Sequence, residues 1–148
     1  DLSIEDVNNF WEQQKKKERK KKGANSILDG VSISLPSVTR SLKLQKRAAK
    51  EGFDWKKPED TLKKVKEELN ELTVEMKAKN KKKIREELGD LLFSCINLSR
   101  KLGMDTETVI RESNRKFEKR FKKMEKQMNK KSLKWELKYL EKEWQNSK

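Results

Sequence analysis

The sequence contains no histidine and only one cysteine, and these two absences exclude several kinds of site. Without histidine the chain cannot form a Ser–His–Asp triad or a zincin-type metal site, and it has no histidine general base. A single cysteine provides neither a disulfide framework nor a cysteine-based zinc site. The chain therefore cannot use chemistry that depends on histidine or on paired thiolates.

Turn-forming residues are also scarce, with 5 glycines and 2 prolines among 148 residues. So few turns argue against a β-sandwich or a barrel. Hydrophobic residues make up 32% of the chain and charged residues 43%, which leaves little apolar surface to bury. Helices that bury one apolar stripe suit this composition, and we predict an all-α helix bundle with short connections.

Long apolar runs are missing as well. No segment approaches the roughly 18–20 residues of a membrane-spanning helix, and no signal-peptide pattern is present, so we expect a soluble, cytoplasmic protein. The chain begins at Asp1 and not at Met, and we therefore expect a fragment or a processed product. Because apolar residues are few, the chain is also expected to complete its core as a homodimer or higher homo-oligomer.

Positive charge is abundant: 39 basic residues face 25 acidic ones, a net charge of +14. This balance favours anionic partners, which include nucleic acid, acidic membrane and polyphosphate metabolites alike. The lysine runs at 15–22 and 79–83 are typical of solvated linkers or helix surfaces. Aromatic residues are few (7%) and no groove-reading motif is present, so nucleic acid is the less favoured partner.

The chain divides into a charged N-terminal part and a longer helical part. Residues 1–35 indicate a charged helix followed by a connector with little to pack, and 36–148 the helical domain. The periodicity and the breaker residues predict helices over about 36–52, 56–79, 82–102, 105–128 and 132–144. Asp105 is expected to cap the fourth of these helices.

Two central helices carry apolar stripes that we predict to be buried. On a wheel of about 100° per residue the stripes comprise Leu62, Val65, Leu69, Leu72 and Met76 on the first helix, and Ile84, Leu88, Leu91, Leu92, Cys95 and Leu102 on the second. The second helix also carries a polar row of Glu87, Asp90, Ser94 and Asn97. Because apolar residues flank this row on both sides, we predict that it points into the bundle.

Carboxylates gather where these two helices are expected to meet. Glu68 and Glu71 lie one turn apart on the first helix, and an antiparallel partner would place Glu87 and Asp90 opposite them. Like charges in a partly apolar site repel unless they are paired, protonated or bound to metal. Oxygen ligands without histidine favour Mg²⁺ or Mn²⁺. Two structural alternatives stay open: surface ion pairs, and a network satisfied by Lys or Arg.

The same region matches a known family. An EExxE…ExxD signature is fitted by “EELNE” (67–71) and “EELGD” (86–90). Three longer segments have the order and spacing that they have in members of that family: “LKLQKRAAKEGFDW” (42–55), “EELGDLLFSCINLSRKLG” (86–103) and “SNRKFEKRF” (113–121). The chain is similar to the MazG-type, all-α nucleoside triphosphate pyrophosphohydrolases over about residues 36–148. With “SILDGVSISLP” (26–36) as a connector, it resembles the C-terminal domain of a tandem-repeat MazG.

The resemblance implies a Mg²⁺-dependent enzyme, with Mn²⁺ able to substitute, in a fold that dimerises through its helices. It implies hydrolysis of (d)NTP to (d)NMP and pyrophosphate by attack of a metal-activated water on the α-phosphorus. By motif position the catalytic groups and metal ligands are Glu68, Glu71, Glu87 and Asp90. The substrate-binding residues that it implies are Lys83, Asn97, Lys116, Arg120, Trp144 and Lys148.

Alternatives remain for the function and for part of the site. A basic, all-helical nucleic-acid-binding or regulatory module without catalysis is one alternative, and a relative specific for one nucleotide is another. Trp144 suits a core or an interface as well as it suits base stacking, and Lys148 is the last residue. Ser113 stands where relatives commonly have Ala, but this departure does not touch the carboxylates.

Overall fold

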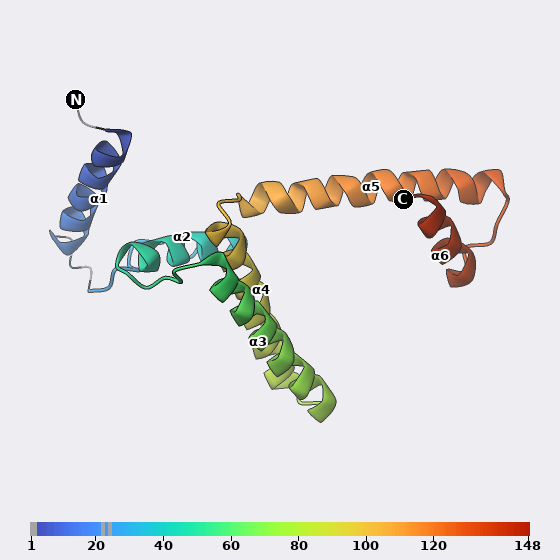
Figure 1. The fold of residues 1–148 in the computed structure, drawn as a ribbon, viewed down its shortest axis with the longest axis horizontal. Helices are drawn as coiled ribbons and strands as arrows, with labels where there is room; N and C mark the ends of the chain where they lie inside the picture. The colour runs from blue at the N-terminus through green and yellow to red at the C-terminus, as the bar shows by residue number, and fades with distance from the viewer. Residues whose placement is uncertain (1–2, 22, 24) are drawn as a thin grey trace. The chain divides into compact units, whose positions relative to one another are not determined.

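The computed structural model of the protein describes residues 3–21, 23 and 25–148 (Figure 1). Across these residues the secondary structure consists of helices, without a strand. The helices are α1 (Ile4–Lys21), α2 (Ser37–Lys50), α3 (Pro58–Ala78), α4 (Lys81–Lys101), α5 (Thr106–Lys130) and α6 (Leu137–Asn146). The predicted all-α fold is confirmed. No helix in the described part of the chain is both long and apolar enough to cross a membrane.

The chain forms two compact units, Asp1–Gly103 with α1 to α4 and Met104–Lys148 with α5 and α6, and each is described by itself. Helices α2 to α5 begin and end within two residues of their predicted positions. Asp105 caps α5 as expected, because its side chain accepts a hydrogen bond from the Thr108 N–H at 3.1 Å.

An antiparallel hairpin of α3 and α4 forms the centre of the first unit (Figure 1). Pro58 opens α3, where a missing backbone N–H removes no helical hydrogen bond. Lys79 ends α3 in the left-handed conformation (φ 55°), and the Asn80 side chain caps α4 by accepting from the Lys83 N–H at 3.2 Å. This two-residue connection fixes which faces of the two helices meet.

Two further helices complete the first unit. Helix α2 packs on α4, where the buried Gln45 donates from Nε2 to the Phe93 carbonyl at 3.0 Å. Helix α1 contacts α2 through two ion pairs, Lys16–Glu51 at 2.7 Å and Lys50–Glu12. The loop after α1 is held by Arg47, whose guanidinium donates to backbone carbonyls of that loop.

The predicted burial of the two apolar stripes is only partly correct. Leu72 is buried, and Val65, Ile84 and Leu91 are half-buried. The exposed members are Leu62, Leu69 and Met76 on α3, and Leu88, Leu92, Cys95 and Leu102 on α4. Two paired helices bury only the seam between them, so the rest of each stripe needs a further surface to cover it.

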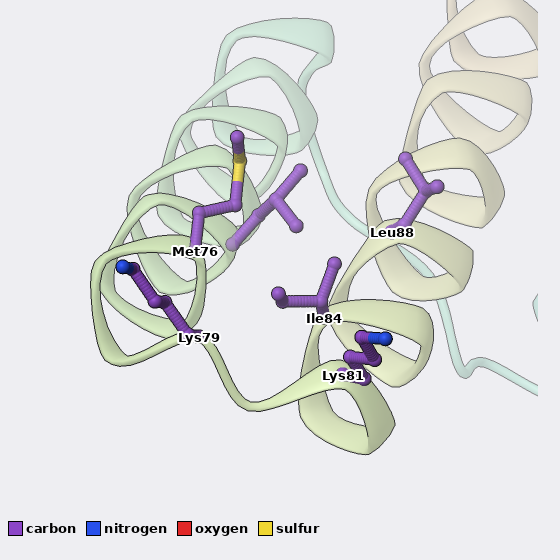
Figure 2. Close-up of a pocket in the computed structure, with 6 residues that line it drawn as sticks. Met76, Lys79, Lys81, Ile84 and Leu88 are labelled. Carbon is purple, nitrogen blue, oxygen red and sulfur yellow. The ribbon is translucent and has the colours of Figure 1, made fainter.

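An open apolar hollow marks the end of the hairpin at the α3–α4 connection (Figure 2). It has a volume of about 550 Å³ and is lined by Leu72, Met76, Ile84 and Leu88, with Lys79 and Lys81. Figure 2 shows Met76 on α3 and Ile84 and Leu88 on α4 beside the space between the two helices. The hollow belongs to the apolar face that the described part of the first unit leaves uncovered.

The second unit is a helical hairpin of α5 and α6, with Met124 and Met128 buried at its centre. Glu143 is only 2% exposed, and its Oε1 lies 2.6 Å from Lys131 Nζ. The helix expected from residue 132 begins instead at Leu137, which corrects the prediction. Ser132 adopts a left-handed φ of 49°, and the Leu133 N–H donates to the Met128 carbonyl at 3.0 Å. This stretch therefore closes α5 before α6 can begin.

Candidate functional site

Three carboxylates of the first unit converge between α3 and α4. Glu68 and Glu71 project from consecutive turns of α3 and Glu87 from α4, and one oxygen of each lies within 4.8 Å of the others. The i,i+3 spacing places the first two on one face of α3. Glu68 is buried, Glu87 is half-buried and Glu71 is exposed, so the cluster is open to solvent on one side.

Compensation of charge in this cluster is incomplete. Lys64 Nζ lies 2.8 Å from Glu68 Oε1 and 3.4 Å from Glu67 Oε1. Among the described residues, Glu71 and Glu87 have no such cation. Oε2 of Glu68 and Oε2 of Glu87 are buried without a hydrogen-bond partner. Because buried oxygens are nearly always paired in folded proteins, these two indicate a missing partner.

The environment also changes the proton affinity of Glu87. Burial raises the pKa of this carboxyl, and so does the hydrogen bond that it shares with the Glu71 carboxyl. The negative charges of Glu71, Asp90 and Glu68 raise the pKa further. Glu87 is therefore the carboxyl of the cluster on which neighbouring negative charge has its clearest effect.

A hard divalent cation fits this arrangement. Mg²⁺ prefers oxygen ligands and is commonly held by carboxylates. Glu68, Glu71 and Glu87 offer one oxygen each within 4.8 Å of the others, so side-chain adjustment could bring all three onto one ion. The two unpartnered oxygens are the acceptors that such an ion would satisfy. Its charge would also remove the repulsion that raises the pKa of Glu87.

Asp90, the fourth predicted ligand, lies outside this group of three. Its side chain is exposed on α4, three residues after Glu87, whereas Ser94 of the same polar row is buried and Asn97 is half-buried. The prediction that the whole row points into the bundle is therefore wrong at Asp90. Among the described elements only α2 and α3 pack on α4, and they leave this side of α4 open.

Two predicted substrate-binding residues of α4 contact other side chains. Lys83 lies in the first turn of α4, four residues before Glu87, and its Nζ is 3.9 Å from Glu75 Oε1. Asn97 accepts a hydrogen bond from Arg100 Nε at 3.0 Å through its Oδ1. The amide of Asn97 thus orients an arginine within the first unit.

The other four predicted substrate-binding residues belong to the second unit, which brings two of them together. Arg120 donates from Nε and Nη2 to the Trp144 carbonyl at 3.1 and 2.7 Å, and its guanidinium carbon lies 3.9 Å from the centre of the Trp144 ring. Trp144 also packs on Phe117, with ring centres 5.4 Å apart. Lys116 and Lys148 are exposed. Arg120 therefore holds the C-terminal end of α6.

Sequence reasoning missed a second acidic site, at Asp54. Arg100 Nη2 and Lys101 Nζ lie 2.5 and 3.1 Å from its two oxygens. Hydrogen bonding to Arg100, with smaller contributions from Lys101 and the Trp55 N–H, lowers the pKa of Asp54 to about 2 against the opposing effect of burial. The local sequence pattern contains no signal for this contact, because Arg100 and Lys101 follow Asp54 by 46 and 47 residues.

Lys64 was also missed, although a signal for it exists. It precedes Glu68 by four residues, the spacing at which a lysine and a glutamate meet on a helix.

Comparison with known proteins places this arrangement in a family. Residues 56–125, which span α3, α4 and most of α5, match the family model of the MazG nucleotide pyrophosphohydrolase domain. Residues 56–125 therefore form a MazG-family domain. The chain is 42% identical over 111 residues to the nucleoside triphosphate pyrophosphohydrolase of Escherichia coli (strain K12). These aligned residues cover 74% of this chain and 42% of that protein.

A bacterial relative from Thermotoga maritima supports the same assignment. This relative, a nucleoside triphosphate pyrophosphohydrolase/pyrophosphatase MazG, is 41% identical to this chain over 107 residues. The aligned residues cover 72% of this chain and 40% of that protein. The chain thus spans about two fifths of the length of the curated relatives that it matches. The MazG domain contains the three clustered carboxylates and Asp90, whereas Trp144 and Lys148 lie beyond the matched residues.

Proposed function

We propose that this chain is a Mg²⁺-dependent nucleoside triphosphate pyrophosphohydrolase that converts (d)NTP and water to (d)NMP and pyrophosphate. One observation carries the proposal: three carboxylates converge in a MazG-family domain and leave two buried oxygens without a partner. The relatives from Escherichia coli and Thermotoga maritima carry this activity in their names. Residues 36–148 are the proposed catalytic domain, and 1–35 the helix and connector before it.

The proposed metal ligands are Glu68, Glu71, Glu87 and Asp90. A bound Mg²⁺, or Mn²⁺ in its place, supplies Lewis acidity to phosphate oxygens and lowers the pKa of a coordinated water. A carboxylate of this set that the ion leaves unsaturated is the proposed proton acceptor for the water that attacks the α-phosphorus. The bond between the α-phosphorus and the bridging oxygen breaks, and pyrophosphate leaves.

The proposed substrate contacts divide by chemistry. Lys83 and Lys116 offer ammonium groups that stabilise negative charge on the phosphates. Arg120 and Lys148 add positive charge, and Trp144 offers a ring face for the base. Because Arg120 is already hydrogen-bonded to the Trp144 carbonyl, its proposed contribution includes holding that ring in position. Asn97 completes the set as a polar contact.

We also propose that the chain forms a homodimer or higher homo-oligomer through the exposed apolar faces of α3 and α4. Val31 and Leu72 are the only buried hydrophobic residues in the described part of the first unit, which is a small core for about 100 residues. Leu69 and Leu92 are 50% and 57% exposed. Burying such a side chain contributes about 1.5–3 kcal/mol, so a second copy would add substantial stability.

Light scattering after size-exclusion chromatography tests the assembly. The double variant Leu69→Lys with Leu92→Lys should be monomeric, because two charges on the interface cannot be buried without partners. Ile33→Lys is the matched control, since Ile33 is 87% exposed in the loop before α2 and should leave the assembly intact. A wild-type chain that is monomeric at micromolar concentration would contradict the proposal.

Product identity tests the reaction. The protein is incubated with each NTP in Mg²⁺ or in EDTA, and the nucleotides are separated by chromatography. We expect NMP and pyrophosphate in Mg²⁺ only, with loss of turnover in Glu87→Gln. Glu86→Gln is the matched control, because Glu86 is the exposed neighbour of Glu87 on α4 and has no ion pair among the described residues. NDP with inorganic phosphate, or no turnover of any nucleotide, would contradict the proposal.

A further inference from the structure

A basic cleft lies between α1 and α2 in the first unit and includes none of the clustered carboxylates. The two helices and the loop after α1 line an open cavity of about 670 Å³. Its lining includes eight basic side chains and two acidic ones, a net charge of +6. The cleft lies before residue 56, outside the matched MazG domain.

The two acidic side chains of the cleft are already neutralised. Glu51 pairs with Lys16 at 2.7 Å, and Glu12 pairs with Lys50. The remaining basic side chains have no carboxylate partner among the described residues, and they are Lys15, Arg19, Lys20, Lys43, Lys46 and Arg47. Six uncompensated cations around one cavity create a site for an anion with several charges.

One of these cations is held in place by hydrogen bonds, and a second lies beside it. The Arg47 guanidinium donates to the carbonyls of Ile27 and Asp29, and both Arg19 and Arg47 lie against Gly30. Burial and the nearby charge of Arg19 lower the pKa of Arg47. Like charges kept this close favour a ligand that accepts hydrogen bonds from both, as phosphate oxygens do.

The distribution of the cations favours an extended ligand over a compact one. On α2, Lys43, Lys46 and Arg47 follow one face towards Lys50, a length of about 10 Å at 1.5 Å per residue. This length exceeds the size of one phosphate group, so the row of cations can follow successive phosphates of one strand. Cations also line the opposite wall on α1, so the charges surround a groove and do not form the flat basic face that binds a membrane surface.

We propose that the α1–α2 cleft binds the sugar–phosphate backbone of a single-stranded nucleic acid without sequence preference. No aromatic side chain lines the cleft, so the bases have no stacking platform there. Binding through phosphates alone makes the affinity depend on salt and not on base identity.

Fluorescence anisotropy of a labelled 20-nucleotide oligothymidylate tests the proposal with the whole chain. The buffer contains EDTA, so that no divalent ion can bridge the strand to the carboxylate cluster. We expect the logarithm of the association constant to fall linearly with the logarithm of the salt concentration, at a slope of about −2 to −4. Each phosphate contact of a single strand contributes about −0.7 to this slope, and we expect three to six contacts. A mixed-sequence oligonucleotide should bind within about twofold of oligothymidylate.

A pair of matched variants locates the site. Lys43→Glu with Lys46→Glu reverses two exposed charges of the cleft three residues apart, and Lys123→Glu with Lys126→Glu makes the same change on an exposed face of α5. The cleft variant should bind at least about tenfold more weakly, with a slope shallower by about 1.4. The α5 variant should stay within about twofold. Lys15→Glu with Lys20→Glu, on the α1 wall, should repeat the loss, and circular dichroism should show unchanged helix content.

The proposal would be overturned by no oligonucleotide binding, by equal losses in the cleft and α5 variants, or by binding that depends on base identity. Inorganic tripolyphosphate at equal phosphate concentration distinguishes a strand from a short polyphosphate. It should compete at least about tenfold more weakly than the unlabelled oligonucleotide, because it engages fewer cations. Equal competition would identify a short polyphosphate as the ligand and would also overturn the proposal.

Discussion

The first unit holds two groups of acidic side chains that are compensated in different ways. Asp54 is surrounded by Arg100 and Lys101, and its pKa is lowered to about 2. Glu87 faces Glu71 and Glu68, and its pKa is raised. Both groups involve α4 and the same kind of functional group. The chain supplies the counter-charge at Asp54, whereas at the carboxylate cluster we propose that an ion from solution supplies it.

The largest expected difference is in kcat/KM, between a variant of the carboxylate cluster and a variant of Asp54. Glu71→Gln should lower kcat/KM at least about 100-fold, or about 2.7 kcal/mol, because it removes a proposed metal ligand. Asp54→Asn should change kcat/KM by less than about threefold, because its contacts hold the fold and not the ion. Initial rates of pyrophosphate release measure both. Similar losses in the two variants would mean that the carboxylate cluster acts through stability alone.

Metal binding should stabilise only the protein with the intact cluster. At a Mg²⁺ concentration of about 100 times Kd, binding adds about 2.7 kcal/mol to the free energy of unfolding and raises Tm by roughly 5–10 °C. The shift should vanish in Glu71→Gln with Glu87→Gln and persist in Asp54→Asn. Thermal unfolding followed by circular dichroism measures it. A full shift in the double glutamine variant would place the ion elsewhere.

The compensated acid should contribute stability without any metal. Asp54→Asn at pH 7 should lower the free energy of unfolding by about 1 kcal/mol, a value reduced for solvent screening. The loss should shrink in high salt, and urea unfolding in EDTA measures it. Glu141→Gln, an exposed acid of α6 without an ion pair in the described part of the chain, should cost less than about 0.5 kcal/mol. Equal losses in the two variants would show that Asp54 is not stabilised by its partners.

The smallest expected effect concerns the sign of the pH dependence. The pKa of Asp54 in the folded protein is below 3.8. Its contribution to the free energy of unfolding is therefore complete above that pH and is lost as the pH falls towards 2. The pKa of Glu87 in the folded protein is above 4.5. Its contribution to the free energy of unfolding is therefore present below pH 4.5 and is lost as the pH rises through the pKa of the folded protein. In EDTA, Glu87→Gln should therefore stabilise the protein at pH 7 and not at pH 4. Urea unfolding at both pH values tests this, and an equal effect at both would contradict it.

The sequence predicts the helices and the meeting of Glu68, Glu71 and Glu87 because both depend on short spacings. Residues three apart share a face, and a two-residue connection returns the second helix beside the first. The ion pair of Asp54 with Arg100 could not be predicted, since it joins residues 46 apart through the loop before α3.

Exposure was less predictable than secondary structure. The apolar pattern shows that Leu69 and Leu92 need to be covered, but it does not show whether the same chain or another copy covers them. The late start of α6 depends on the left-handed conformation of Ser132, a conformation that serine seldom adopts and that its sequence neighbours do not indicate.

The short α3–α4 connection also has a kinetic consequence. All three clustered carboxylates come from residues 68–87, within one hairpin whose contacts are local in sequence. Such hairpins form early in folding, on the microsecond-to-millisecond timescale of local helical contacts. We therefore expect the repulsion among the carboxylates to arise early in folding, while much of the chain is still unordered. A divalent ion that relieves this repulsion would speed folding as well as stabilise the product.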